Sequence, residues 1–429
     1  MRFLSFLRPP LFNAPPESDN NIAARLCFAC DTPWTGTLEA CPLLTLLRDS
    51  DSSRWTLFAL RVSGVWQAEC ESQSDIAYDA ASRECVKTQL HLRGSCDRQS
   101  VHPMATSSHP LVGRLAPSPT GAQHVGNART FLIAWLSIRS RGGRVILRIE
   151  DIDSPRVKPW AVQQVIDDLR WLGLDWDEGP DIGGPQAPYM QTERLARYAA
   201  ALEFLKQGDR IYPCLCTRTD IAEAASAPHP GQEGPIYPGT CSHRTPADAV
   251  SLAAEYAWRF RVSDQTHQLD DRFCGSVSCC PARELGDFVI GKKDGTPAYQ
   301  LAVVVDDHEM GVTEVCRGDD LLPSAFRQRE LYEAFHWQLP KFVHVPLVVG
   351  ADGRRLAKRH GDTRISVLRE QGVPPERLLG VLAWSCGWQA DRYPVAIADL
   401  LPVFDLSRIP STPFVMTESL WRELLLGTV

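Results

Sequence analysis

The chain has 429 residues, a formal net charge of −7 and a pI near 5.9. This length allows two or three domains with a sizeable buried core. The acidic balance argues against a protein that binds nucleic acid through a broad basic field, because neutralising phosphates needs clustered Lys and Arg. A local basic patch is still compatible with the composition.

Two features of the sequence concern its cellular setting. No run approaches the roughly 18 consecutive apolar residues of a membrane-spanning helix, and residues 1–10 (MRFLSFLRPP) lack the apolar centre and cleavage site of a signal peptide. We therefore expect a soluble, cytoplasmic protein. The fourteen cysteines are dispersed through a long chain, which predicts reduced thiols with one metal site rather than a disulfide scaffold.

The first 110 residues differ from the rest. They contain Pro and Ser clusters and six scattered cysteines, without a sustained period of 3.6 or 2. Organised sequence begins at Leu111, shortly after Met104. We expect residues 1–110 to be an N-terminal extension, either disordered or an over-extended start, rather than a functional domain, because no apolar pattern is present to build a core.

From residue 111 the expected elements alternate in type. Strands are predicted over 111–116 and 144–150, and helices over 127–140, 157–173 and 191–207. This succession predicts an α/β fold, a Rossmann-type parallel sheet with crossover helices.

A stretch rich in Cys, Gly and Pro at 212–244 interrupts this pattern. Strand-like segments follow at 256–262 and 287–291, and the α/β pattern resumes through 298–305, a helical segment at 324–337 and an apolar run at 342–350. We therefore expect one catalytic domain in two halves, 111–207 and 291–350. An insertion at 208–290 separates these halves, and a short, mainly helical region at 351–429 ends the chain.

Residues 114–127 (RLAPSPTGAQHVGN) lie where the first strand turns into the first helix, the place where open α/β sheets bind ligands. The glycines allow close backbone approach, the imidazole can donate to a phosphate oxygen, and the helix start is expected to offer free N–H groups and a positive dipole end. No lysine follows in Walker fashion. We predict an ATP site formed by Pro117, Thr120, Gly121, His124, Gly126 and Asn127. The alternative is an ordinary Pro/Gly-rich turn.

A basic, glycine-flanked loop at 353–361 (GRRLAKRHG) comes after the late apolar run. If it closes over the triphosphate, Lys358 can neutralise charge that builds on the α-phosphate and on pyrophosphate as they separate. Taken alone, such a charge run is more often a solvated face.

In combination these stretches resemble class I aminoacyl-tRNA synthetases of the glutamyl family. Residues 114–127 resemble the HIGH motif in its glutamate form, and 148–156 (RIEDIDSPR) with 173–178 (GLDWDE) are similar to the segments that come after this motif in the family. The later loop resembles KMSKS, and 361–372 (GDTRISVLREQG) also resembles that family. Arg355 and Ala357 depart from the first lysine and the serine of KMSKS, whereas Lys358 is retained.

The resemblance, which covers about 111–388, implies ATP-dependent activation of L-glutamate, with Mg²⁺ on the ATP and with His124 and Lys358 as catalytic residues. Glutamate needs an acidic partner for its ammonium group and a guanidinium for a carboxylate. The implied glutamate pocket comprises Arg114, Leu115, Ala116, Pro117, Ser118, Glu150, Tyr299 and Arg317. Its carboxylate ligands would be Arg114 and Arg317, and its ammonium partner Glu150. Taken singly, Glu150 could instead cap a helix, Tyr299 could be a core aromatic and Arg317 could be a surface turn residue.

Two cysteine clusters in the insertion predict a metal site. Cys214 and Cys216, with Cys241 further along, supply three thiolates for a tetrahedral zinc ion. The fourth ligand is either Tyr237, as in short members of the glutamyl family, or His243, whose spacing resembles certain full-length members; we favour Tyr237. Four protein ligands would make the ion structural. Unrelated buried cysteines are the alternative, and Cys274, Cys279 and Cys280 are left unassigned.

Because the sequence ends at Val429, we expect it to lack the long helical anticodon-binding region that follows the KMSKS loop in full-length glutamyl-tRNA synthetases. This resembles the short branch of the family, which implies a monomer that transfers glutamate to the queuosine base in the anticodon of tRNA(Asp). Two alternatives stay open. One is a truncated synthetase that charges tRNA(Glu), and the other is a catalytically silent paralogue that binds RNA or a protein partner.

Overall fold

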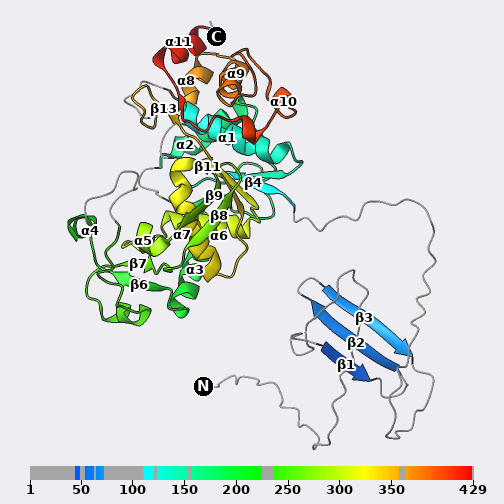
Figure 1. The fold of residues 1–429 in the computed structure, drawn as a ribbon, viewed down its shortest axis with the longest axis vertical. Coiled ribbons are helices and arrows are strands. Elements are labelled where there is room, and N and C mark those ends of the chain that lie inside the picture. The colour runs from blue at the N-terminus through cyan, green and yellow to red at the C-terminus, as the bar shows by residue number, and fades with distance from the viewer. Residues whose placement is uncertain are drawn as a thin grey trace, which may run out of the picture. The chain divides into compact units, whose positions relative to one another are not determined.

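A computed structural model describes residues 110–119, 123–152, 157–224, 236–356 and 363–427, together with three strands near the N-terminus (Figure 1). The chain divides into two units, 1–100 and 101–429. In the first unit, β1 (Leu44–Arg48), β2 (Arg54–Arg61) and β3 (Gly64–Glu71) form an antiparallel meander in the order β1-β2-β3. These strands were not predicted from the sequence. The rest of 1–109 lies outside the described residues, so the expectation for this extension stays a prediction.

A parallel sheet forms the centre of the second unit. Strand β4 (Val112–Leu115) pairs in parallel with β5 (Arg144–Leu147), and β11 (Glu314–Gly318) pairs in parallel with β12 (Lys341–Val345). The two pairs meet where Thr313 N–H donates to Val112 O (2.9 Å) and Val112 N–H donates to Thr313 Oγ1 (2.9 Å). The predicted α/β architecture with parallel strands is therefore confirmed, with halves about 200 residues apart in the chain joined at β4 and β11.

Helices enclose this sheet in two apolar cores. Helix α1 (Val125–Arg139) packs on β4, β5 and β11, and α2 (Pro159–Trp171) follows β5. A second core contains α3 (Leu195–Gln207), which follows the turn η3 (Gln191–Glu193), with α6 (Tyr299–Glu309) and α7 (Leu322–Ala334). The turn η5 (Asp319–Leu321) joins β11 to α7.

The second half of the sheet begins with a different segment from the one that the sequence pattern indicated. Residues 299–305 belong to helix α6, with Ala298 as its N-cap, and the strand that resumes the sheet is β11, which was not predicted. Residues Leu301 to Asp307 of α6 are all buried, so its apolar run shows no helical period. Strand β11 carries Glu314 and Arg317 at buried positions, and these charges hide it from a search for apolar runs.

The predicted insertion contains an antiparallel sheet and a separate hairpin. Strands β6 (Ile211–Cys214), β7 (Ala257–Phe260) and β10 (Phe288–Gly291) pair in the order β10-β7-β6, with α4 (Arg218–Ala224) and η4 (Pro246–Ser251) between β6 and β7. The hairpin of β8 (His267–Asp271) and β9 (Gly275–Cys279) packs instead on β12, and α5 (Pro281–Glu284) comes after it. The boundaries 208–290 stay a prediction.

The end of the chain is mainly helical. It comprises α8 (Ile365–Glu370), α9 (Pro375–Ser385), α10 (Ile397–Leu400), η7 (Leu406–Arg408) and α11 (Glu418–Leu426). Strand β14 (Phe414–Val415) runs back to pair in parallel with β13 (Val348–Val349), and these elements share the first core with α1 and α2. Within the described part of the chain, no helix is both long and apolar enough to cross a bilayer.

Candidate active site and metal site

His124 forms the N-cap of α1. Its Nδ1 accepts hydrogen bonds from the N–H groups of Gly126 (3.1 Å) and Asn127 (3.3 Å), and Asn127 Oδ1 accepts from His124 N–H (3.2 Å). Burial, reinforced by Arg355, lowers the pKa of His124 to about 4. The ring is therefore neutral near pH 7, and because Nδ1 is an acceptor, Nε2 carries the proton. His124 can donate that Nε2–H to a phosphate oxygen.

The first turn of α1 differs from the expectation of free N–H groups. Val125 N–H donates to Thr363 O (3.2 Å), Ala128 N–H donates to His124 O (3.1 Å), and the two amides between them are bound to the imidazole. A phosphate at this turn would therefore meet the imidazole and the positive end of the helix dipole rather than free amides. The sequence could not show this, because the capping acceptor is a His ring instead of the usual Ser, Thr, Asp or Asn.

Both ends of the late basic loop lie beside His124. After the loop, Ile365 N–H donates to Gln123 O (2.9 Å) and Arg364 forms a β-bridge with His124. Before it, Arg355 is near enough to affect the pKa of His124, and its Nη1 also pairs with Asp320 Oδ2 at 2.8 Å. Lys358 lies in 357–362, outside the described residues, as do Thr120 and Gly121 in 120–122.

Gly126 is needed for the position of the His124 ring. A Cβ at residue 126 would lie 2.9 Å from His124 Cε1, 3.0 Å from its Nδ1 and 3.3 Å from Val348 Cβ. Gly126→Ala should therefore displace the imidazole and reduce glutamate-dependent ATP–pyrophosphate exchange about 10- to 100-fold, because small displacements of catalytic groups have large effects on rate. Gly208→Ala is the matched control, since its added Cβ meets nothing closer than 3.6 Å; equal rates for both variants would contradict this role of Gly126.

Four residues of the predicted glutamate pocket converge at the centre of the sheet. Arg114 is on β4, Arg317 on β11, Glu150 follows β5, and Tyr299 begins α6. Burial and Glu150 raise the pKa of Tyr299, while Arg317 and Arg114 oppose that rise, so all four groups lie within electrostatic reach of one another. Arg114 Nη1 donates to Cys316 O (3.1 Å), and this bond fixes its guanidinium against β11.

The main chain that surrounds these groups is also ordered. Pro117 O accepts the N–H of Glu150 (3.0 Å), which holds the Pro-rich turn against the segment after β5. Leu115 and Pro117 are buried, Ala116 is half-buried and Ser118 is exposed. Of the residues 114–118, Ser118 is thus the one whose side chain faces solvent.

A network of buried charges that the sequence did not predict supports the pocket. Arg148 is fully buried, with Nη1 2.7 Å from Asp307 Oδ1, Nη2 3.0 Å from Glu150 Oε1 and Nε 3.7 Å from Asp306 Oδ2. Arg194 pairs with Asp306 at 2.6 Å. Asp306 and Asp307 come from a distant part of the chain, so only the folded structure could reveal their pairs with Arg148 and Arg194.

The free donors of this network suit an acidic ligand. Its charges are balanced, because Arg114, Arg148, Arg194 and Arg317 face Glu150, Asp306 and Asp307, and Arg194 also pairs with Glu309 Oε2 at 2.6 Å. Among the described residues, the buried Nη1 of Arg317 has no hydrogen-bond partner, and the buried Nε of Arg114 has only an ion-pair contact with Asp307 Oδ1 at 3.5 Å. Buried donors without partners are costly, and a substrate carboxylate would satisfy them.

The three predicted thiol ligands form a compact cluster. The Sγ atoms of Cys214, Cys216 and Cys241 lie within 4.8 Å of one another, with Cys216 and Cys241 3.7 Å apart. Tyr237 Oη lies 3.4 Å from Cys214 Sγ and 3.8 Å from Cys216 Sγ. Tetrahedral zinc with Zn–S bonds of about 2.3 Å separates its sulfur ligands by about 3.8 Å, so these spacings suit such an ion. His243, the other candidate ligand, is exposed.

Two arginines contact this cluster from outside. Arg244 Nη1 donates to Cys241 Sγ (3.1 Å) and Arg259 Nε donates to Cys214 Sγ (3.3 Å), while the Arg259 guanidinium lies 3.8 Å from the centre of the Tyr237 ring. Guanidinium donors favour the thiolate form that binds metal. The eight cysteines in the described part of the second unit are all free thiols; of the three left unassigned, Cys274 and Cys280 donate to the carbonyls of His344 (3.4 Å) and Asp264 (3.3 Å).

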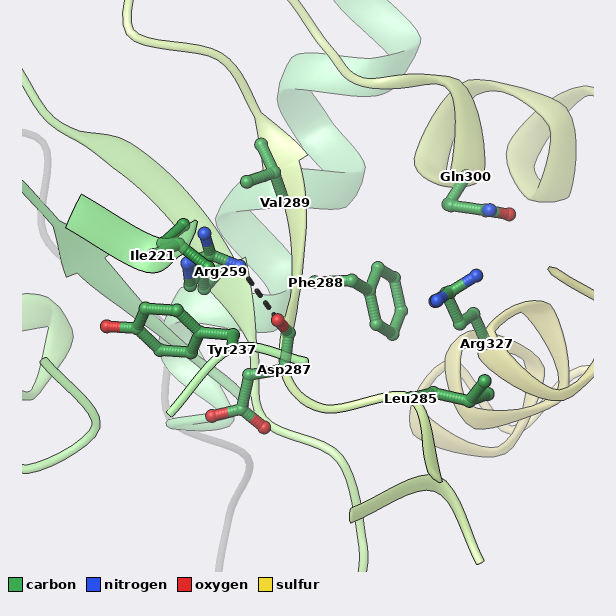
Figure 2. Close-up of a pocket in the computed structure, with 9 residues that line it drawn as sticks. All are labelled: Ile221, Tyr237, Arg259, Leu285, Asp287, Phe288, Val289, Gln300 and Arg327. Carbon is green, nitrogen blue, oxygen red and sulfur yellow. Dashed lines mark hydrogen bonds between the residues drawn. The ribbon is translucent and has the colours of Figure 1, made fainter. Parts of the chain in front are cut away.

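A separate pocket lies between the insertion and α6 (Figure 2). It has a volume of about 270 Å³, with Tyr237 and Arg259 on one side and Gln300 and Arg327 on the other. Arg259 Nη1 donates to Asp287 O (2.8 Å), and the Gln300 amide is bound to Ser324 (2.9 Å) and Gln328 (3.0 Å). Gln300 follows Tyr299 of the glutamate pocket directly in α6, but none of the four converging glutamate residues lines this pocket.

Comparisons with known proteins agree with this geometry. The family described as tRNA synthetases class I (E and Q), catalytic domain, matches residues 110–400. The chain therefore belongs to the class I tRNA synthetases, and the family predicted from the sequence is confirmed. The structure also resembles the solved glutamate-tRNA synthetase from Elizabethkingia anophelis, with a TM-score of 0.62 and 30% identity over 74% of this chain and 70% of that one.

Two similar relatives are both named glutamyl-Q tRNA(Asp) synthetase. The relative from Rhodopirellula baltica is 54% identical over 287 residues, which cover 64% of this chain and 85% of the relative. The relative from Symbiobacterium thermophilum is 50% identical over 307 residues, which cover 71% of this chain and 95% of the relative.

Proposed function

We propose that this protein is a ligase that activates L-glutamate with ATP and transfers it to the queuosine base in the anticodon of tRNA(Asp). The observation that carries the proposal is its similarity to relatives of that name over 85% and 95% of their lengths. The buried, guanidinium-rich pocket supports glutamate as the substrate, because it offers both an acidic group and Arg317 Nη1, a donor without a partner among the described residues.

Activation needs orientation and charge stabilisation more than it needs a general base. The α-carboxylate of glutamate is already a nucleophile; its oxygen attacks the α-phosphorus of ATP, and pyrophosphate leaves. Glu150 holds the ammonium group. Arg114 and Arg317 hold the side-chain carboxylate, which keeps its charge, whereas the α-carboxylate loses its charge when it forms a mixed anhydride with the α-phosphate.

ATP binds over the turn that precedes α1, through Pro117, Thr120, Gly121, His124, Gly126 and Asn127. His124 donates from Nε2 to the phosphates, and Lys358 approaches them from the loop whose two ends lie beside His124. Mg²⁺ bound to the triphosphate neutralises further charge. His124 and Lys358 are thus the two catalytic residues of the proposal.

In the second step a queuosine ring hydroxyl attacks the activated carbonyl carbon. An ester forms, AMP leaves and the hydroxyl proton is released. The insertion is stabilised by one structural Zn²⁺ held by Cys214, Cys216, Cys241 and Tyr237, whose spacing supports four-coordinate binding without an open position.

The acceptor is tested by incubating the protein with ATP, labelled glutamate and either queuosine-containing tRNA(Asp) or tRNA(Glu). We expect label on tRNA(Asp) alone, and loss of that label when the tRNA lacks queuosine. Label on tRNA(Glu) alone would instead support a truncated glutamyl-tRNA synthetase. Without glutamate-dependent pyrophosphate exchange, the protein would be a silent RNA- or partner-binding paralogue.

A further inference from the structure

A chain of buried hydrogen bonds runs from the β8–β9 hairpin to Arg317. Arg317 on β11 and His344 on β12 are register partners, and Arg317 Nε donates to His344 Nε2 at 3.0 Å. On its other side, His344 Nδ1 lies 2.7 Å from Asp271 Oδ2, at the end of β8. The exposed fractions of Arg317, His344 and Asp271 are 5%, 0% and 5%, so water cannot replace either bond.

Only one tautomer of His344 satisfies both neighbours. Arg317 Nε is always a donor, so His344 Nε2 must accept, and its proton must lie on Nδ1 and point to Asp271. Asp271 must accept at both oxygens, because Oδ1 also receives the N–H groups of Phe273 (2.9 Å) and Cys274 (2.8 Å). Burial lowers the pKa of His344, and this keeps the ring in the neutral form that can accept from Arg317.

The same contacts orient the rest of the guanidinium. Arg317 Nη2 donates to Leu321 O (3.3 Å), and the group lies 5.3 Å from the centre of the Phe342 ring. Two of its three nitrogens are thereby fixed by the protein. The third, Nη1, is the buried nitrogen that has no partner among the described residues.

We propose that Asp271 and His344 are positioning residues, which hold Arg317 so that Nη1 meets the non-reacting carboxylate of a dicarboxylic amino acid. This inference rests on the proposed function of Arg317 in glutamate binding. A fixed, planar guanidinium recognises a carboxylate better than a freely rotating one, because less conformational freedom is lost on binding. The hairpin, which lies in the predicted insertion, therefore helps to select the amino acid.

Asp271→Asn is the sharpest test. The Asn amide nitrogen cannot face the N–H groups of Phe273 and Cys274, so it should turn toward His344 Nδ1 and force the ring proton onto Nε2, opposite Arg317 Nε. We expect the KM for glutamate in ATP–pyrophosphate exchange to rise about 10- to 100-fold, as for the loss of a hydrogen bond to a charged group. The KM for ATP and the kcat at saturating glutamate should change less than threefold.

His344→Gln supplies the second variant. A Gln side chain can present its carbonyl oxygen to Arg317 without depending on a tautomer, so its KM for glutamate should lie between those of the wild type and Asp271→Asn. Adding Asp271→Asn to His344→Gln should then raise the KM little further, because the two residues act through one chain of bonds. Purely structural roles would give additive losses of Tm without selectivity for glutamate.

The outcomes separate this inference from the proposed function. If the wild type exchanges pyrophosphate with glutamate but both variants keep its KM for glutamate within twofold, the positioning role is wrong and the function stands. Equal rises in the KM values for glutamate and ATP would also contradict positioning. A wild type without glutamate-dependent exchange would overturn the function and this inference together.

Discussion

The His124→Asn variant is expected to lose about 10²- to 10³-fold in glutamate-dependent ATP–pyrophosphate exchange while it keeps a Tm close to that of the wild type. The rate falls because the Nε2–H donor to the phosphates is removed, and a single such donor accounts for an effect of this size. The fold is kept because Asn is among the best N-cap residues and can accept from the first amides of α1 in place of His124 Nδ1.

Two further variants distinguish the helix-capping role of His124 from its role in catalysis. His124→Ala should lose the exchange rate and also about 1 kcal/mol of stability, since Ala cannot cap the helix. His308→Asn is the matched control: this His is exposed and stacks on Trp337, away from α1, and should exchange at the wild-type rate. A His124→Asn variant that exchanges within threefold of the wild type would remove His124 from the mechanism.

The same residue predicts a pH dependence of stability. Because burial and Arg355 lower the pKa of His124 to about 4, from about 6.5 in the unfolded chain, its contribution to stability is complete above about pH 6.5. That contribution is lost as the pH falls toward about 4. Thermal melts from neutral pH down to about pH 4.5 should therefore show the wild type losing Tm relative to His124→Asn. A constant difference in Tm across this range would contradict the lowered pKa.

The Cys216→Ser variant is expected to lose the bound zinc, which should be about one ion per wild-type chain, and to lower Tm strongly. Structural zinc binds with an apparent free energy of about 10–16 kcal/mol in small domains, and β6, where Cys214 lies, pairs with β7 within the insertion. Metal content by mass spectrometry and thermal melts with and without a chelator measure both effects. Cys280→Ser is the matched control, because Ser can still donate to Asp264 O, and it should retain full zinc.

A pair of variants identifies the fourth zinc ligand. Tyr237→Phe removes the hydroxyl that lies 3.4 Å from Cys214 Sγ and should weaken zinc binding, whereas His243→Ala alters an exposed side chain and should leave it unchanged. The reverse pattern would make His243 the ligand.

The sequence allowed us to predict those parts of the site whose residues are close together in the chain. The strand-to-helix turn with His124 and the two cysteine clusters are short motifs, and the structure brings each of them together. Strand β11 was missed because its buried positions carry Glu314 and Arg317. A search for apolar runs misses a strand whose buried charges are paired with residues distant in the chain, as Glu314 is with Arg141 and Arg272.

The groups beneath the glutamate pocket were missed for the same reason. Arg148 pairs with Asp307, 159 positions later in the chain, and Asp271 reaches His344 across 73 positions. Neither spacing leaves a local pattern. The Arg148 and Arg317 contacts therefore became visible only once the two halves of the sheet had been joined.

The central claim is that the His124 turn and the Lys358 loop act on one phosphate group while Arg317 holds glutamate. A crystal structure with a non-hydrolysable glutamyl-adenylate analogue tests it most directly. We predict that the phosphate-mimicking group will lie within hydrogen-bond distance of both His124 Nε2 and Lys358 Nζ, with the side-chain carboxylate on Arg317 Nη1 and the ammonium group on Glu150. An analogue bound with either His124 or Lys358 out of contact, or with its side-chain carboxylate away from Arg317, would contradict the account.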